Sequence, residues 1–160
     1  MAIREIRKVG DPCLSKVCDR VEEFGTGLAQ LLEDLQDTLL TTTGVGIAAP
    51  QIGELKRVIV TKDIDTNKIE EYINIEILEQ GDETERSEGC LSVPNLVGKV
   101  RRPEFVKIRA QDRYGETFEK TILGIMARVI SHELDHLDGH IYTEFATETW
   151  EREEVKVEES

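Results

Sequence analysis

The chain has 160 residues, of which 39% are hydrophobic, and a formal net charge of −13. This length suits one domain whose core needs no disulfide bonds. The acidic balance and the dispersed basic residues exclude a general nucleic-acid binder, because sequence-independent affinity for phosphates needs clustered Lys and Arg.

The first regular element is a helix expected over residues 28–39. Its apolar side chains recur at helical spacing, with acidic residues on the opposite side. The apolar positions are Leu28, Leu31, Leu32, Leu35 and Leu39. Gly44 is expected to end this helix as a C-terminal glycine. The following run, G-V-G-I-A-A-P-Q-I-G, contains too much glycine for a regular element and indicates an ordered loop that brings backbone close to another group.

The middle of the chain is expected to form antiparallel strands. The strand patterns are R-V-I-V-T (57–61), Y-I-N-I-E-I-L-E (72–79), E-F-V-K-I-R-A-Q-D-R (104–113) and E-T-F-E-K-T-I (116–122). A turn at Tyr114 and Gly115 joins the last two. A second helix is expected over residues 123–137 and should stop at Asp138 and Gly139. The predicted fold class is α+β, with antiparallel β-sheets packed around this central helix and an N-terminal helix beside them.

The second helix carries the run H-E-L-D-H. His132 and His136 are four residues apart, so their side chains leave one face of the helix and can converge on a single ion. Glu133 lies about 100° round the helix from His132, near enough to reach a bound water without being a ligand. Two imidazoles that hold a cation, and a carboxylate that takes a proton from the water it acidifies, are typical of metal hydrolases.

Such a site needs a third protein ligand if it is catalytic. His140 is four residues beyond His136, but residues 132 and 140 would be about 12 Å apart along a continuous helix, so His140 is expected to be a surface histidine. Cys90, in S-E-G-C-L-S-V-P, is the better candidate. A lone cysteine is nevertheless more often a small buried hydrophobe than a ligand.

Three motifs stand in a fixed order along the chain: G-V-G-I-A-A-P-Q at 44–51, E-G-C-L-S at 88–92 and H-E-L-D-H at 132–136. With these motifs the sequence resembles the bacterial peptide deformylases, and weaker similarity extends over nearly the whole chain to Tyr142. The resemblance implies a metal-dependent hydrolase that removes the N-formyl group from the initiator methionine of nascent polypeptides and releases formate.

Carried over position by position, the resemblance implies that Cys90, His132 and His136 bind the ion. Glu133 would act as general base on the metal-bound water, which is the nucleophile, and then as acid toward the departing amine. The Gln51 side-chain amide and the backbone N–H of Leu91 would stabilise the oxyanion. Ferrous iron is the expected physiological ion, and zinc, nickel or cobalt are compatible with the same thiolate and imidazole ligands.

The resemblance also implies how the peptide is held. The backbone of Gly44, Val45 and Gly46, with Gly89 opposite, would bind it as an added strand. Glu88 would shape the methionine pocket, although a surface salt bridge is the alternative for this residue. Asp135 is expected either to support a ligating histidine or to be an ordinary carboxylate on the helix surface.

A catalytic domain is expected over residues 1–146 and an acidic tail over residues 147–160, either as a short exposed helix around Trp150 or frayed. Some relatives dock on the ribosome through a basic C-terminal helix, whereas this tail is dominated by Glu, so no tail-mediated docking is expected. Many relatives carry an arginine where this chain has Val97, which predicts weaker peptide binding.

The sequence contains no segment typical of a membrane or secreted protein, which bears on the expected location and partners. No stretch approaches the roughly 20 apolar residues that span a bilayer, and the first residues contain no apolar signal core. Three cysteines are an odd number, which favours reduced thiols over a disulfide framework. We therefore expect a soluble cytoplasmic protein with no membrane or nucleic-acid partner. The resemblance adds formyl-methionyl peptides as the expected partners.

Two other functions fit the H-E-L-D-H run by itself. One is a metallopeptidase that cleaves internal peptide bonds, with Glu144 or Glu148 as the third ligand. The other is a zinc-stabilised binding module in which protein atoms fill all four coordination positions.

Overall fold

The computed structural model describes residues 2–151, and within that range the chain forms two α-helices, eight strands and three short 3-10 turns. In chain order they are η1 (Pro12–Ser15), α1 (Thr26–Leu39), β1 (Gly46–Ala48), η2 (Ala49–Ile52), β2 (Val58–Lys62), β3 (Ile69–Gly81), β4 (Thr84–Cys90), β5 (Val93–Arg102), β6 (Phe105–Gln111), β7 (Thr117–Leu123), α2 (Ile125–Leu137), η3 (Tyr142–Glu144) and β8 (Glu148–Glu151).

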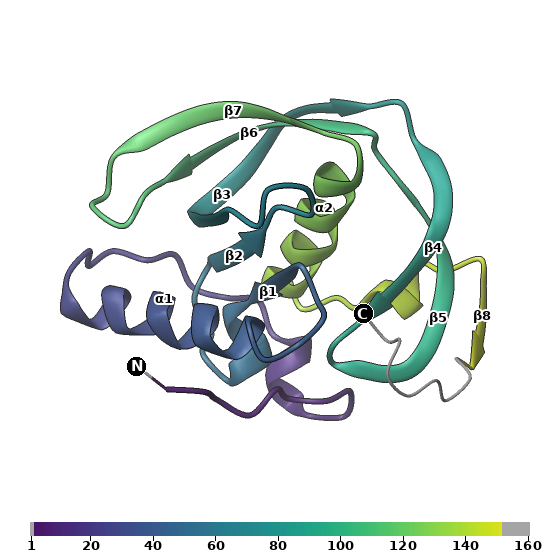
Figure 1. The fold of residues 1–160 in the computed structure, drawn as a ribbon, viewed down its shortest axis with the longest axis horizontal. Helices are drawn as coiled ribbons and strands as arrows, with labels where there is room; N and C mark the ends of the chain where they lie inside the picture. The colour runs from purple at the N-terminus through teal and green to yellow at the C-terminus, as the bar shows by residue number, and fades with distance from the viewer. Residues whose placement is uncertain (1, 152–160) are drawn as a thin grey trace.

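The strands form two antiparallel sheets around a central helix. The larger sheet has the order β1-β2-β3-β6-β7 and the smaller one β4-β5-β8. Helix α2 lies in the middle of the molecule, with the larger sheet curved over it and the smaller sheet along its flank (Figure 1). The predicted α+β class with a central helix is confirmed. In the described part of the chain, no helix has both the length and the apolar character needed to cross a bilayer.

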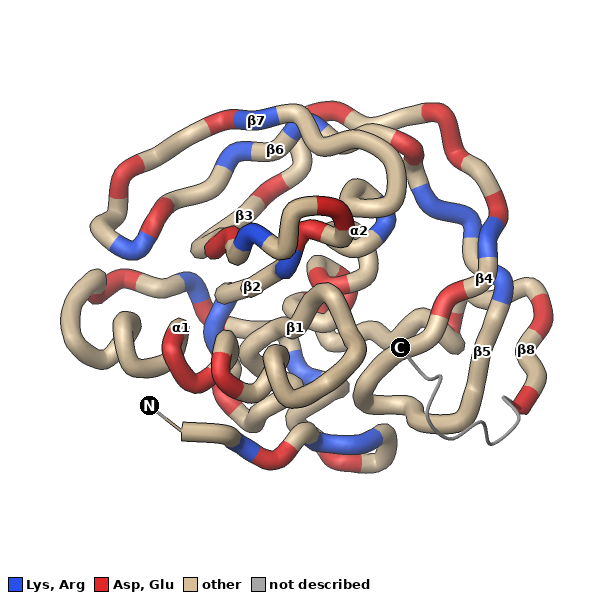
Figure 2. Tube along the Cα trace, viewed as in Figure 1, with Lys and Arg blue, Asp and Glu red and all other residues tan. Residues whose placement is uncertain are grey.

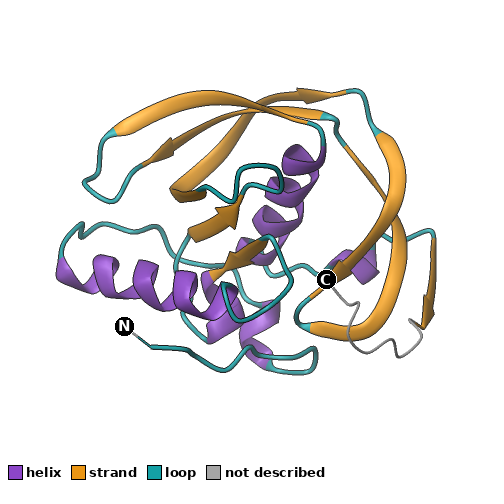
Figure 3. Ribbon diagram, in the orientation of Figure 1, coloured by secondary structure: helices purple, strands orange, loops and turns teal. Residues whose placement is uncertain are grey.

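Strand β2 is buried on both faces because the two helices cover opposite sides of the larger sheet. Ile59 packs in one core cluster with α2, whereas Val58 and Val60 pack in a second cluster with α1. Burial on both faces explains the continuous apolar run of this strand, because a strand with one solvent-exposed face would alternate apolar and polar residues. Figure 3 shows α1 and α2 on either side of β1 and β2. The expected strands and the Tyr114–Gly115 turn are confirmed by β2, β3, β6 and β7.

Helix α1 matches its predicted span, but its predicted end is wrong. The helix stops at Leu39, five residues before Gly44, and its last carbonyls accept from the backbone N–H groups and hydroxyls of the following threonines rather than from a glycine turn. The hydroxyl of Thr41 donates to the Thr38 carbonyl at 2.7 Å, and that of Thr42 to the Leu39 carbonyl at 2.8 Å. Gly44 does not end the helix and instead lies against Leu91 of the second motif.

The glycine-rich run after α1 was expected to be a loop without a regular strand, and this prediction is wrong in part. Residues 46–48 form β1, which pairs with β2, and residues 49–52 form the turn η2. The expected close approach is confirmed, since a Cβ placed on Gly46 would lie 2.7 Å from Val129 Cγ1 on α2. Glycine at this position lets the sheet edge touch the helix that carries the histidines.

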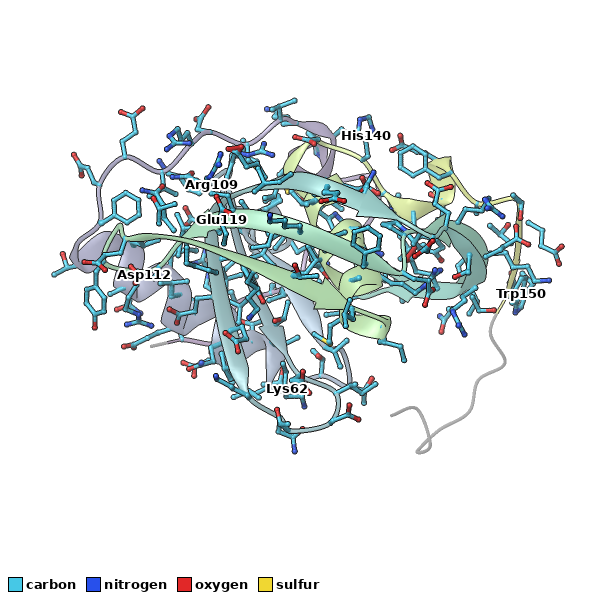
Figure 4. All side chains as sticks on the ribbon, turned by 90° about the horizontal axis from the view of Figure 1, so that it is seen from above. Lys62, Arg109, Asp112, Glu119, His140 and Trp150 are labelled. Carbon is cyan, nitrogen blue, oxygen red and sulfur yellow. The ribbon has the colours of Figure 1, made fainter. Side chains whose placement is uncertain are left out.

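The smaller sheet was not predicted from the sequence. Strand β8 pairs with β5, with Trp150 opposite Val97, and the backbone N–H of Thr147 donates to the Lys99 carbonyl at 2.8 Å. A helix or a frayed tail around Trp150 is therefore wrong for residues 148–151, because the free edge of β5 offers backbone partners that an isolated helical turn lacks. Figure 4 shows Trp150 at the periphery of the molecule. Residues 152–160 of the expected tail lie outside the described residues.

Helix α2 ends where Gly139 meets the N-terminal part of the chain. Gly139 has φ +83°, and a Cβ at this position would lie 2.8 Å from the carbonyl carbon of Ser15. The positive φ and the close backbone contact both require glycine. This contact fixes the end of the histidine helix against residues more than a hundred positions earlier in the chain.

We predict that Gly139→Ala lowers the free energy of unfolding by about 2 to 4 kcal/mol, because the new Cβ adds left-handed strain to a clash with rigid backbone. Gly27→Ala in the first turn of α1 is the matched control, since a Cβ there meets nothing within 4 Å. The control should leave stability unchanged or raise it by up to about 1 kcal/mol. Urea titration of both variants checks this, and equal midpoints would contradict the role assigned to Gly139.

Candidate metal centre

Three predicted ligands from two elements meet at one point. Cys90 is the last residue of β4, and His132 and His136 lie one turn apart on α2. One ligand atom from each residue lies within 4.8 Å of the other two, and Cys90 Sγ is 3.3 Å from His136 Nε2. A thiolate and two imidazoles at this separation suit a divalent transition-metal ion. The group is the sole cluster of this kind among residues 2–151.

The surroundings of the two histidines differ. Burial lowers the pKa of His136 to about 3, so its imidazole is neutral, as a ligand must be. Burial also acts to lower the pKa of His132, but the Cys90 sulfur and the Glu88 carboxylate outweigh it and raise that pKa well above its usual value. Glu88 Oε1 lies 3.5 Å from His132 Nδ1, which leaves Nε2 of His132 to face an ion.

Glu133 lies beside the ligands with an unsatisfied carboxylate oxygen. Its side chain is buried, and Oε1 has no hydrogen-bond partner among the described residues. Burial raises the pKa of Glu133 to about 7. Its other oxygen, Oε2, would be 2.9 Å from a Cβ on Gly46, so the carboxylate is held between α2 and the edge of β1. A buried carboxylate with a free oxygen next to a metal site is suited to proton transfer.

The carboxamide of Gln51 is fixed at both ends. Its Oε1 accepts a hydrogen bond from the Ala48 backbone N–H at 2.9 Å, and its Nε2 donates to Ser92 Oγ at 3.1 Å. The same Nε2 lies 3.9 Å from Cys90 Sγ. Because the acceptor end is occupied, the amide presents an N–H donor toward the ligand cluster. Ser92 was not singled out in the sequence, although it closes the motif that carries Cys90.

The first and second motifs also contact each other, through Gly44 of the first and Leu91 of the second. A Cβ on Gly44 would lie 3.1 Å from a Leu91 methyl group, so the run before β1 touches the turn after Cys90. Gly89 precedes Cys90 at the end of β4 and is exposed. In the described part of the chain β1 pairs only with β2, and β4 only with β5. Each strand therefore keeps one unpaired edge near the cluster.

Arg102 links two acidic groups beneath the histidines. Its Nε and Nη2 atoms both donate to Glu88, at distances from 2.9 to 3.3 Å, and its Nη1 donates to Asp135 Oδ2 at 2.6 Å. Burial acts to raise the pKa of Glu88, but His132 and Arg102 together lower it to about 2. The surface salt bridge considered for Glu88 is in fact buried, and Asp135 contacts Arg102 rather than a ligating histidine.

A second buried arginine, which the sequence analysis also missed, ties α2 to the smaller sheet. Arg128 lies one turn before His132 and donates to the Thr84 carbonyl at 3.0 Å and to the Val100 carbonyl at 2.9 Å. Thr84 belongs to β4, the strand that ends in Cys90, so this guanidinium bridges the two elements that supply the ligands. An arginine between apolar positions of a helix is the available signal for such a buried anchor.

The alternative third ligands are engaged elsewhere. Glu144 pairs with His140 at 2.9 Å and accepts from the Ile141 N–H, while Glu148 is exposed in β8. His140 has 49% of its side chain exposed, as expected of a surface histidine, and Figure 4 shows it at the rim of the molecule. The geometry therefore favours Cys90 over both glutamates. It also leaves one side of the cluster without a fourth protein ligand among the described residues.

Comparison with known proteins gives consistent matches over nearly the full chain. The model of the polypeptide deformylase family matches residues 3–151. Peptide deformylase 1 of Bacillus cereus is 44% identical over 157 residues, which cover 98% of this chain and 100% of that protein. The peptide deformylase of Caldicellulosiruptor bescii is 43% identical over 156 residues, covering 98% of this chain and 93% of its own length.

Solved structures show the same fold. The peptide deformylase of Thermotoga maritima superposes with a TM-score of 0.88 at 35% identity, covering 92% of this chain and 100% of that chain. The class I type b peptide deformylase of Acinetobacter baumannii bound to Met-Ala-Ser has a TM-score of 0.85 at 34% identity, covering 90% of this chain and 99% of that chain.

We predict that Arg102→Ala lowers the free energy of unfolding by about 2 to 4 kcal/mol, because it leaves the largely buried Glu88 and the partly buried Asp135 without their partner. It should also weaken metal retention by about ten- to a hundredfold, since Glu88 would no longer be held against His132. Arg101→Ala is the matched control, because the neighbouring side chain is 57% exposed and contacts Glu83 at 3.6 Å. The control should change stability by no more than about 0.5 kcal/mol.

Chemical unfolding and metal analysis after dialysis against a chelator measure both quantities. Indistinguishable behaviour of the two variants would show that the buried ion pairs of Arg102 do not support the site.

Proposed function

The chain belongs to the polypeptide deformylase family, and we propose that the Cys90, His132 and His136 cluster with Glu133 carries out its hydrolysis of formyl-methionyl peptides. The observation that carries this assignment is the meeting of three ligand atoms within 4.8 Å beside a buried carboxylate. The enzyme is a metal-dependent hydrolase that removes the formyl group and releases formate.

The donor set fits one divalent cation. Such a cation would polarise the formyl carbonyl and make water acidic enough to attack near neutral pH. We propose ferrous iron as the physiological ion, with zinc, nickel or cobalt able to occupy the same ligands, because a thiolate beside two imidazoles accepts any of them. The buried Glu88 and Arg102 would hold His132 in the orientation that binding requires.

Glu133 would move the proton in both halves of the reaction. It would take a proton from the water as the water oxygen bonds to the formyl carbon, and then give that proton to the methionine nitrogen as the carbon–nitrogen bond breaks. Formate and a free amino terminus are the products. The buried position of Glu133 and the unpartnered Oε1 support this role, because that oxygen is available to a water in the site.

The tetrahedral intermediate would carry its negative charge beside Gln51 and the turn after Cys90. The Gln51 Nε2 donor, already oriented by Ser92 and Ala48, and the Leu91 backbone N–H would donate to this oxyanion. Preorganised neutral donors suit this task because they need no rearrangement as the charge develops.

The peptide would lie between the unpaired edges of β1 and β4. Main-chain groups of Gly44, Val45 and Gly46 would bind it on one side and Gly89 on the other, a mode that tolerates varied side chains after the methionine. The relative from Acinetobacter baumannii bound to Met-Ala-Ser supports a peptide of this kind as the ligand. The placement of Glu88 in the methionine pocket stays a prediction, since its observed contacts are with Arg102 and His132.

We predict that Glu133→Gln lowers kcat for formate release by about 10²- to 10⁴-fold while the bound metal stays at one equivalent, because Glu133 handles protons without binding the ion. The assay uses formyl-Met-Ala-Ser under anaerobic conditions with ferrous iron. Glu144→Gln, which changes an exposed glutamate outside the cluster, is the matched control and should keep full activity.

Cys90→Ser tests the ligand set in the same assay and should lose both metal and activity. Full metal retention by this variant, or an unchanged kcat in Glu133→Gln, would overturn the proposed roles.

We also propose a cytoplasmic location, a catalytic unit formed by residues 1–146, and no ribosome docking through residues 147–160. The three free cysteines fit a reducing compartment. Acidic residues lie on α1, β3, β4, β7 and β8, as Figure 2 shows, and the chain carries a net charge of −13. A surface of this kind is repelled by ribosomal RNA phosphates.

We predict that the full chain and a chain lacking residues 152–160 both stay in the supernatant when ribosomes are pelleted at physiological salt. The deletion stops short of β8, so the pairing of this strand with β5 is kept. Strong cosedimentation of the full chain that the deletion abolishes would show that the tail docks after all.

A further inference from the structure

Residues 4–18, here called the N-terminal strap, contribute no ligand or proton donor to the proposed reaction, yet they contact the first two motifs and the end of α2 directly after the third. The strap is the purple ribbon at the lower edge of Figure 1, leading from the N-terminus to η1. Its contacts are made mainly by backbone amides and by small buried side chains. They are specific enough to suggest a role beyond covering the core.

The strap binds main-chain carbonyls of the first motif. The backbone N–H of Arg7 donates to the carbonyl of Gln51 at 2.7 Å, so the residue whose amide faces the metal cluster is anchored through its main chain. The Cys13 thiol donates to the carbonyl of Pro50 at 3.3 Å. Gly53 then passes close to the strap, since a Cβ there would lie 2.8 Å from an Arg7 guanidinium nitrogen.

Two residues after Arg7, the strap holds the second motif. The backbone N–H of Val9 donates to the carbonyl of Ser92 at 2.8 Å. Leu14, which is 1% exposed, packs in one cluster with Val93. Because Arg7 and Val9 are two residues apart, their amide nitrogens are separated by no more than about 7 Å. The carbonyls of Gln51 and Ser92 are therefore kept at a bounded separation by a short stretch of chain.

The strap continues to the end of the histidine helix. The backbone N–H of Cys18 donates to the carbonyl of Leu137 at 2.8 Å, and the backbone of Ser15 meets Gly139. Cys18 is 4% exposed and packs in the core cluster that contains α2. The same segment is thus bonded to each part of the chain that supplies a group to the site.

We propose that the N-terminal strap is a positioning element for the oxyanion donors, which sets the spacing between the Gln51 amide and the Leu91 N–H through the Arg7 and Val9 backbone bonds. The inference rests on the proposed function. Leu91 lies between the ligand Cys90 and the anchored Ser92, and the Ser92 hydroxyl accepts from the Gln51 amide at 3.1 Å. Releasing Ser92 would let both donors drift while the three metal ligands keep their own supports.

Val9→Pro removes the Val9 N–H, and because the proline Cδ takes the place of the hydrogen, it also pushes the Ser92 carbonyl away from the strap. The Asp11 N–H donates to the Lys8 carbonyl at 3.0 Å and Gly10 has φ +105°, so residues 8–11 form a turn of type II geometry with Val9 at its second position. Proline is favoured at that position. The Val9 side chain is 57% exposed, so its loss leaves no core cavity. Val9→Ala keeps the N–H and is the matched control.

We expect Val9→Pro to lower kcat for formate release by about three- to tenfold, the effect of one lost hydrogen bond, with KM and metal content unchanged. Val9→Ala should match the parent enzyme. In a Gln51→Ala background, Val9→Pro should cost less than about twofold, because the spacing of two donors no longer matters when one is absent. A general structural defect would instead persist in both backgrounds.

An unchanged kcat in Val9→Pro, or an equal loss with and without Gln51, overturns the proposal, while loss of activity in Gln51→Ala alone leaves the proposed function standing. Should Val9→Pro unfold or lose metal, Arg7→Pro and Arg7→Ala replace the pair, since the Arg7 N–H donates directly to the Gln51 carbonyl. The proposal then requires a lower kcat in Arg7→Pro than in Arg7→Ala at equal metal content, and equal rates overturn it.

Discussion

Three donor atoms from two separate elements must come within bonding reach of one ion, and metal–sulfur and metal–nitrogen bonds of about 2.0 to 2.3 Å leave little tolerance. Helix α2 supplies two imidazoles whose spacing is set by the helical turn. The Cys90 thiol lies at the end of β4 in the smaller sheet. Its distance from the imidazoles therefore depends on how that sheet is fixed to α2. Much of the remaining structure can be understood as the means of fixing it.

Two buried arginines connect the smaller sheet to α2. Arg128 binds carbonyls of β4 and β5, and Arg102 joins Glu88 on β4 to Asp135 on α2. A buried guanidinium is costly unless its donors are satisfied, and here backbone carbonyls and carboxylates satisfy them in directions that only one relative placement of sheet and helix allows. Simple apolar packing would tolerate sliding between the two elements, whereas these directional bonds resist it.

Elements whose structure is set by the local sequence pattern could be predicted, whereas those that depend on contacts between distant residues could not. Helix α2 and strand β6 follow from periodicity, and the convergence of His132 and His136 follows from helical spacing. The smaller sheet did not follow, because β8 is stabilised by an edge of β5 that local sequence does not reveal. Ser92 holds the Gln51 amide and Arg102 holds Glu88 through contacts made only in the folded chain, so their importance could not be inferred from their own neighbourhoods.

The strap also determines when the enzyme can be completed during its own synthesis. Residues 4–18 are translated well before their partners Ser92 and Leu137. Contacts between distant parts of a chain pay a loop-closure cost before they contribute stability, and they slow folding accordingly. Docking of the strap can therefore be complete only after nearly the whole domain has emerged. The full set of contacts made by the strap is in this sense among the last to form, although its residues are made early.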